Sequence, residues 1–550
     1  MGAVGQAPVT GGDSGAGREP APVTGGFLAR AALLTAVLTV GGAVLGLVRD
    51  QALARLFGAG GATDAFLVAW TVPEFAATLL IEEGLALALV PLFSLALARR
   101  ARGAGGDPVR ALVAATLPRL ASAFAAVAAL IALTAPGLVA VLAPGLSDPG
   151  LAVDCTRLTA TCVLSFGLAG YCSAALRAHR RFVAPAAIYI AYNAGIIATM
   201  VALGGRWGVR AAAAGVAAGG CLMVAVQLPG LWRQVRRRDT PPAAAGGAGG
   251  TPMGGALVAA VLLFALCRQA QVLVERFLAS SLPAGAISHL NYAQKVAQIP
   301  MTLSLMLCTV TFPLVARAVA EGDTERARAR VERDVALAAC VVLLGAATVV
   351  SCAPQIIELL FQRGAFTPGD TAATAGVMRV YALGLLAQTV VGALVRSYFS
   401  AGRPSWYPLG AMGAGIAVTA GAGGWAVGPW GVAGIAAANA AGITVTAALL
   451  LRGLGARGVP VRVRRVLGGL VRALLAAVAA TPAGAYAARC ATAYAAAPLP
   501  ALAAGACAVA AVFAAVFVLA GRAPGLRGLA TPLSASPAAP PPPLTPPSAP

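Results

Sequence analysis

The side chains best suited to chemistry in this chain are charged groups that lie inside long apolar segments. Lys295 is the only lysine of the sequence, and an apolar run follows it. Arg49 and Asp50 lie in the first apolar segment. The second apolar segment carries carboxylates at Asp64, Glu74, Glu82 and Glu83. A charge at membrane depth normally faces a partner or a watery cavity. Because lysine and arginine bind phosphate through charge and hydrogen bonds, these positions favour an anionic ligand, particularly a phosphate or pyrophosphate.

Two of these charges also have simpler interpretations. Asp64 follows the glycine-rich break "GAGGAT", so it could be the N-cap of the next helix. Arg49 could be an interfacial arginine that reaches the headgroups. Neighbouring residues of a helix point in different directions, so we expect no pairing within Arg49–Asp50 or within Glu275–Arg276. Pro300 follows Lys295 by five residues and predicts a bend in that helix.

Other kinds of site are not indicated. The ten cysteines form no C-x-x-C pair and the two histidines, His179 and His289, lie far apart, so we expect neither a metal nor a cofactor. The sequence has no nucleotide-binding G-x-x-x-x-G-K-[ST] motif. The net charge of +21 is spread over the chain and does not form one basic patch, so no nucleic-acid partner is expected. We expect a protein that is not an enzyme.

The composition predicts an all-α polytopic membrane protein. The chain is 59% hydrophobic and 11% charged, and its mean hydropathy is +0.83. About 20 apolar residues are needed to cross the bilayer core, and by this measure the chain has about 14 transmembrane helices. They divide into two six-helix lobes followed by two C-terminal helices.

The predicted domain boundaries follow shifts in composition. Residues 1–26 form a disordered cytoplasmic tail, and residues 232–254 form a basic, then Gly/Ala/Pro-rich cytoplasmic linker. The N-lobe covers 27–231 (helices one to six), the C-lobe 255–453 (helices seven to twelve), and the last two helices 454–521. A proline-rich cytoplasmic tail follows at 522–550.

The arginines predict the orientation. Twenty lie in loops or tails on the side of the N-terminus, and four lie on the other side. The four are Arg206, Arg210, Arg363 and Arg489. Cytoplasmic loops carry the excess of positive charge, so both termini are predicted to be cytoplasmic.

Four stretches of the sequence resemble a known family. They are "VLGLVRDQALARLFGAGGATDAFLVAW" (44–70), "VERFLASSLPAGAISHLNYAQKVAQIP" (274–300), "LLFQRGAFTPGDT" (359–371) and "RSYFSAGRPSWYP" (396–408). The chain is similar here to the MurJ/MviN lipid II flippases of the multidrug/oligosaccharidyl-lipid/polysaccharide exporter superfamily. The resemblance implies outward movement, by alternating access, of undecaprenyl-pyrophosphate-linked peptidoglycan precursor (lipid II) across a bacterial inner membrane. It also implies a lipid-linked oligosaccharide substrate, contact with membrane lipids and possible partners in cell-wall synthesis.

The resemblance further implies four substrate-binding residues. Arg49 matches a cavity arginine of the first helix, and Asp64 and Glu82 match acidic residues of the second. Lys295 stands where the family has an arginine in the eighth helix.

The chain also departs from the family pattern. Ala43 and Ala77 replace two arginines that the family uses, and no Asp or Asn occurs between Tyr407 and Val427, where some relatives bind sodium. Two alternatives therefore stay open. One is a divergent paralogue that exports another polyprenyl-linked glycan or a small amphiphile, and the other is a non-transporting membrane scaffold.

Overall fold

The structure is a computed structural model that describes eight stretches of the chain. They are 25–82, 84–102, 106–236, 255–306, 324–400, 406–457, 463–494 and 497–522. The described residues form helices and no strand. The N-terminal tail, most of the linker at 232–254 and the proline-rich tail lie outside these stretches, as does Glu83.

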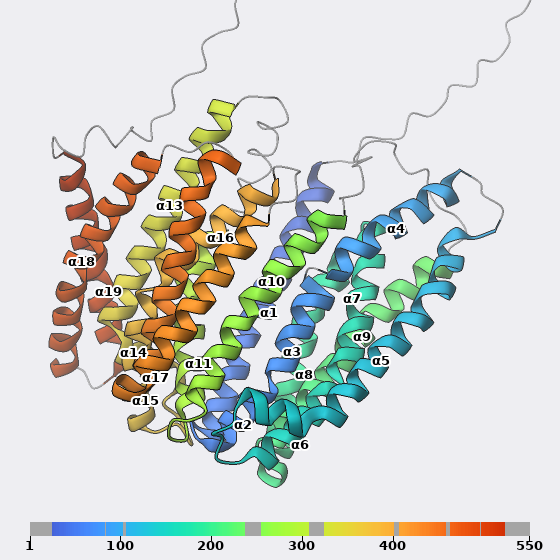
Figure 1. The fold of residues 1–550 in the computed structure, drawn as a ribbon, viewed down its shortest axis with the longest axis horizontal. Helices are drawn as coiled ribbons and strands as arrows, with labels where there is room; N and C mark the ends of the chain where they lie inside the picture. Colours follow the sequence, from blue (N-terminus) through green and yellow to red (C-terminus); the bar gives the residue numbers. More distant parts are fainter. Residues whose placement is uncertain are drawn as a thin grey trace, which may run out of the picture.

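The first half of the chain forms one group of helices, which lies to the right in Figure 1. The second apolar segment is broken into four pieces, namely α2, α3, the π-helical η1 and α4. The break between α2 and α3 lies at Trp70, three residues before Pro73, and the π-helical turns of η1 follow at Ala77–Glu82. The bounds are α1 (Gly25–Phe57), α2 (Gly61–Ala69), α3 (Thr71–Ala76), η1 (Ala77–Glu82), α4 (Gly84–Ala101), α5 (Pro108–Leu142), α6 (Pro149–Ala160), α7 (Cys162–Ala178), α8 (Val183–Trp207) and α9 (Arg210–Arg236).

The second half forms a second group, to the left in Figure 1. The helix that carries Lys295 ends at Ala297, and the chain is helical again from 299 to 306, so the predicted bend near Pro300 is a break of the helix. The bounds are α10 (Gly255–Ala279), α11 (Ala286–Ala297), α13 (Thr324–Ser351), α14 (Ala353–Phe361), α15 (Pro368–Ala382), α16 (Leu385–Ser400), α17 (Tyr407–Arg457), α18 (Val463–Tyr494) and α19 (Pro498–Arg522).

Helix α17 is a hairpin of two antiparallel halves. The backbone reverses at Gly431, whose φ of 53° and ψ of −133° suit glycine alone. The Thr446 hydroxyl donates to the Ala411 carbonyl at 3.3 Å, and Gly415 faces Gly442 without a side chain between the helices. Small residues at this interface let the two backbones approach closely, as is usual between membrane helices.

The number of spans agrees with the prediction only in part. By length and composition, the described residues contain 11 helices that could cross a membrane, or up to 12 if the bent pair α15–α16 is one span. That measure takes Tyr407–Gly453 as a single helix although it folds back on itself. The region predicted as the eighth span, 284–316, is described only as far as residue 306. The count of fourteen therefore stays a prediction.

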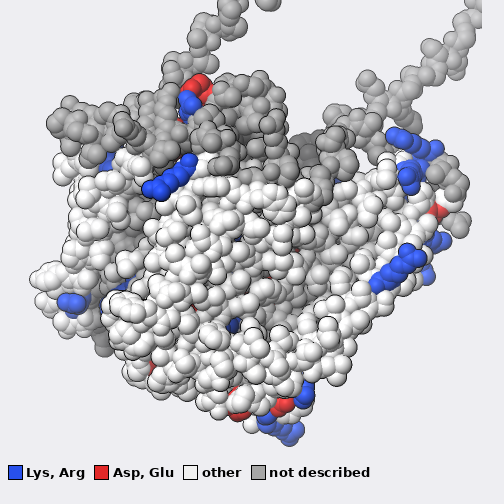
Figure 2. All heavy atoms as spheres, in the orientation of Figure 1, with Lys and Arg blue, Asp and Glu red and all other residues white. Residues whose placement is uncertain are grey.

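The outer surface is that of a membrane protein. Figure 2 shows a broad uncharged band, with charged atoms gathered at its two ends. Large apolar side chains are exposed along α5, including Leu130 at 59%, Leu133 at 78% and Val141 at 72%. Helix α4 ends at the basic pair Arg99–Arg100, beyond the apolar residues. The chain is a multi-pass membrane protein.

Candidate functional site

A buried cluster of three charges joins the two halves of the chain. Asp50 of α1 forms ion pairs with Arg49 at 2.7 Å and, across the two groups of helices, with Lys295 of α11 at 3.3 Å. The side chain of Asp50 is 9% exposed. One carboxylate therefore faces two cations, and the cluster keeps a net positive charge.

The expected geometry of Arg49 and Asp50 was wrong. We expected these neighbours to point apart, but the Arg49 Nε and Nη2 both donate to Asp50 Oδ1, at 3.0 and 2.7 Å. The spacing rule describes where side chains leave a helix, whereas the long arginine stem can turn its guanidinium back over the adjacent short residue. Burial favours this contact, because each charge would otherwise stand alone in an apolar surrounding.

Two neutral residues hold these cations in place. Asn193 of α8 accepts a hydrogen bond from Arg49 Nη1 at 3.1 Å, and its own amide donates to the carbonyls of Gly42 and Tyr189. The ring of Trp70 lies 4.6 Å from the Arg49 guanidinium carbon and 5.7 Å from Lys295 Nζ. An aromatic face attracts cations, so Trp70 serves both. Neither residue was predicted from the sequence.

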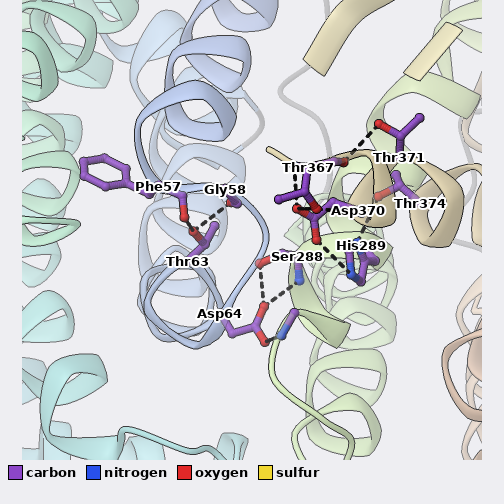
Figure 3. Close-up of polar contacts among 11 residues, drawn as sticks. Phe57, Gly58, Thr63, Asp64, Ser288, His289, Thr367, Asp370, Thr371 and Thr374 are labelled. Carbon is purple, nitrogen blue, oxygen red and sulfur yellow. Dashed lines mark hydrogen bonds and ion pairs between the residues drawn. The ribbon is translucent and has the colours of Figure 1, made fainter. Parts of the chain in front are cut away.

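Asp64 connects the two halves at the end of the molecule where α2 and α6 lie. Its carboxylate accepts hydrogen bonds from Gly285 N at 2.6 Å, Ser288 N at 2.7 Å and the Ser288 hydroxyl (Figure 3). Asp64 is not the N-cap of α2, which begins at Gly61. It binds instead the N-terminus of α11, whose free N–H groups attract an anion.

Further polar contacts surround this closure, as Figure 3 shows. His289 Nδ1 lies 2.9 Å from the Thr374 hydroxyl, and its Nε2 lies 3.9 Å from Asp370. Asp370 closes a capping box with Thr367 at the start of α15. The backbone of α1 joins the same region, since Ala365 N donates to the Arg55 carbonyl at 2.9 Å. We give this group of contacting residues the name closed end. It consists of Asp64, Gly285, Ser288, His289, Thr367, Asp370, Thr374, Arg55 and Ala365.

Glu275 and Arg276 have separate partners, as their adjacency predicted. Arg276 is 6% exposed and reaches from α10 to Glu74 of α3 at 2.8 Å, and it also donates to the Thr71 hydroxyl. Glu275 is 3% exposed and accepts from the Tyr381 hydroxyl at 2.9 Å and from the Asn439 amide. Arg276 is thus a further bridge between the halves.

A cavity of about 710 Å³ lies beside these charges, mainly in the second half of the chain. It follows α10 from Val261 to Glu275, a rise of about 21 Å at 1.5 Å per residue. Its lining has two cations, Arg268 and Lys295, and two carboxylates, Glu74 and Glu275, so the formal charges cancel.

The predicted site residues lie in three different places. Lys295 lines the cavity, and it also borders a small hollow whose lining includes Arg49 and Asp50. Asp64 lies at the closed end, and Glu82 is exposed and accepts from the Tyr189 hydroxyl at 3.3 Å. Arg49 does not line the 710 Å³ cavity, and it meets Lys295 only at the small hollow. Asp50 pairs with both Arg49 and Lys295 and balances one of their two charges.

Three other arginines of the second half, Arg268, Arg276 and Arg379, lie in different surroundings. Arg268 lines the cavity and has no ion pair with the described residues, whereas Arg276 is bound to Glu74. Arg379 donates to the Val350 carbonyl at 3.1 Å and is exposed. Among the described residues, no cluster of three or more His, Cys, Asp or Glu side chains is arranged to hold a metal ion.

Comparison with known proteins decides the family. The family model described as "Lipid II flippase MurJ" matches residues 53–501. The chain belongs to this family. A lipid II flippase MurJ of Burkholderia cenocepacia is 28% identical over 387 residues, which are 67% of this chain and 73% of that protein. A probable lipid II flippase MurJ of Vibrio cholerae is 25% identical over 487 residues, with 83% and 88% of the two chains covered.

Solved structures show the same fold. A lipid II flippase MurJ in an inward closed conformation matches with a TM-score of 0.70 and 18% identity, over 89% of this chain and 98% of that one. An inward-facing MATE family transporter of the MOP superfamily matches with a TM-score of 0.59 and 13% identity, over 76% and 96%. The two-lobed MurJ architecture expected from the sequence is therefore confirmed, while the exact number of spans is not.

Proposed function

We propose that this MurJ family member moves lipid II from the inner to the outer leaflet of the bacterial plasma membrane by alternating access, for cell-wall synthesis. The observation that carries the proposal is the arrangement of Asp64 and Lys295. One holds the lobes together at the closed end, and the other lies between the charged cluster and the cavity. A transporter needs a ligand site and a closure that can open on one side. The activity is transport, without a chemical step.

The orientation of the protein follows from the arginines. The excess of arginine on the side of the N-terminus supports cytoplasmic termini and an extracytoplasmic closed end. The protein would then bind its ligand from the cytoplasm, and the Asp64 contacts with α11 would have to break before release outside. Residues 232–254 and 522–550 would both lie in the cytoplasm, and the latter could contact cell-wall synthesis proteins.

The four predicted residues have separate roles in this proposal. Lys295 contacts the pyrophosphate. Arg49 contributes to the electrostatic potential around Lys295, because both cations pair with Asp50. Asp64 governs opening of the closed end. Glu82 is exposed beside Tyr189 and would meet the ligand as it enters between the lobes.

Complementation tests the proposal. We expect this chain to restore growth to cells depleted of their own lipid II flippase, and Lys295→Ala to fail at equal membrane expression. Lack of rescue by the well-expressed parent chain would contradict the proposal. We expect deletion of residues 522–550 to be tolerated. If this deletion abolished function while the core charges could be neutralised without effect, a membrane scaffold would be favoured.

A second candidate is the export of another polyprenyl-linked glycan or a small amphiphile. The balanced formal charge of the cavity favours it, because two cations cancelled by two carboxylates attract a pyrophosphate weakly. Export of such a substrate that persists when Arg49 and Lys295 are both neutralised, by a parent chain that does not rescue flippase-depleted cells, would support this candidate over lipid II.

A further inference from the structure

The wall of the cavity is rich in carboxamide side chains. Seven lining residues are Asn or Gln, whereas four are charged. Two of the amides donate to protein groups other than these amides, Gln269 to the Glu74 carbonyl and Asn439 to Glu275. The other five are Gln271, Asn291, Gln294, Gln298 and Gln388.

The amides of α11 form one stripe that also includes the lysine. Asn291, Gln294, Lys295 and Gln298 have the spacing i, i+3, i+4 and i+7, which places them on one face of the helix. Gln298 Nε2 donates to Gln388 Oε1 of α16 at 3.3 Å, so the stripe continues onto the next wall. Lys295 therefore has neutral amides on both sides along the helix.

Asn291 gives an independent indication of a ligand. The residue is 8% exposed, and its Nδ2 has no hydrogen-bond partner among the described residues. A buried amide donor without a partner costs about 1–3 kcal/mol. Asn291 is a lining residue of the cavity, so rotation of its side-chain amide would present this donor to an acceptor on a bound molecule.

We propose that these five amides bind the sugar part of the lipid-linked substrate, beside the pyrophosphate at Lys295. This inference rests on the proposed function and adds what recognises the glycan. Each amide offers two donors and an acceptor, which match the hydroxyl and acetamido groups of a glycan. The wall belongs to the second lobe, on α10, α11 and α16, so the sugars lie against that lobe. The cancelling charges of the lining also suit the uncharged sugars better than a second anionic group.

Two ligands that share the polyprenyl pyrophosphate and differ in the sugar-peptide headgroup test the proposal. Binding of lipid II and of undecaprenyl pyrophosphate to the purified full-length chain is measured by native mass spectrometry. We expect Gln298→Ala and Gln388→Ala each to weaken binding of lipid II roughly two- to twelve-fold and to leave undecaprenyl pyrophosphate unchanged. Lys295→Ala should weaken the binding of both ligands.

A matched control variant is Gln355→Ala on α14. Gln355 also has a buried amide atom without a partner, its Oε1, but it does not line the cavity. We expect this variant to bind both ligands as the parent does. Thermal unfolding of all variants checks that they fold.

The outcomes separate the two proposals. If the amide variants weakened the binding of both ligands equally, or of neither, the sugar site would be overturned. The proposal of lipid II transport would not be affected by this result. Failure of the parent chain to bind lipid II would overturn both.

Discussion

The hydrogen bonds of Asp64 lead to a quantitative prediction for Asp64→Asn. The carboxylate accepts three hydrogen bonds from Gly285 and Ser288, and bonds to a charged group are worth about 1.5–3 kcal/mol each, against about 0.5–1.5 for neutral ones. The asparagine oxygen can keep the two bonds from Ser288 in weaker form, but its amide faces the Gly285 N–H. One hydrogen bond is lost and two are weakened, so the free energy that favours the closed conformation falls by about 3 kcal/mol or more. The open population should therefore rise at least about a hundredfold.

Labelling of a cysteine introduced within the closed end measures this population. Ala286 is 3% exposed, so Ala286→Cys reacts with a membrane-impermeant maleimide only when the closed end opens. Peptide mass spectrometry separates this site from the native cysteines. In the Ala286→Cys background, Asp64→Asn should raise the labelling rate at least about a hundredfold, because the rate follows the open fraction.

A control and an intermediate variant sharpen the test. Asp148→Asn removes a carboxylate that caps α6 within the first lobe, so it should leave the labelling rate unchanged. Ser288→Ala removes only the hydroxyl bond and should raise the rate less than Asp64→Asn. An unchanged rate for Asp64→Asn, or an equal rise for Asp148→Asn, would refute the assignment of Asp64 as the bond that holds the lobes together.

Three further variants test other parts of the structure. Asp50→Asn removes the shared carboxylate of two half-buried cations and should destabilise the protein by about 1.5–3 kcal/mol, seen as a lower Tm in detergent; Asp154→Asn, from an exposed ion pair, should cost about 1 kcal/mol or less. Arg276→Ala breaks the bridge from α10 to α3, so labelling of the closed end should accelerate; an unchanged rate would contradict a role in closure. Gly431→Ala forces a side chain onto the glycine-only turn of α17 and should cost about 1–3 kcal/mol by the same Tm assay, whereas Gly424→Ala, which meets open space, should not.

The sequence predicted the class of fold well because apolar length is a local property. Each apolar stretch could be measured against the thickness of the bilayer core. The separate partners of Glu275 and Arg276 also followed from helix geometry.

The arrangement of the charges could not be predicted, because it depends on which helices meet. Asp64 binds a helix more than 200 residues away, and Asp50 pairs with Lys295 across the lobes. Trp70 gives no signal in a chain full of apolar residues until both cations are seen beside it. The spacing of Asn291, Gln294, Lys295 and Gln298 places them on one helix face already in the sequence. Only the cavity shows that this face is available for binding.

The pairing of Lys295 with Asp50 has a consequence for turnover. The carboxylate occupies the ammonium as an internal counter-ion, so an arriving pyrophosphate has to compete with it. This competition lowers affinity, but it also eases release, because the carboxylate can retake the lysine as the phosphate departs. The unloaded protein then keeps Lys295 paired, so its return to the starting conformation avoids the penalty of leaving this charge without a partner. A transporter with moderate affinity for its ligand and a low energetic cost of returning unloaded is suited to repeated turnover.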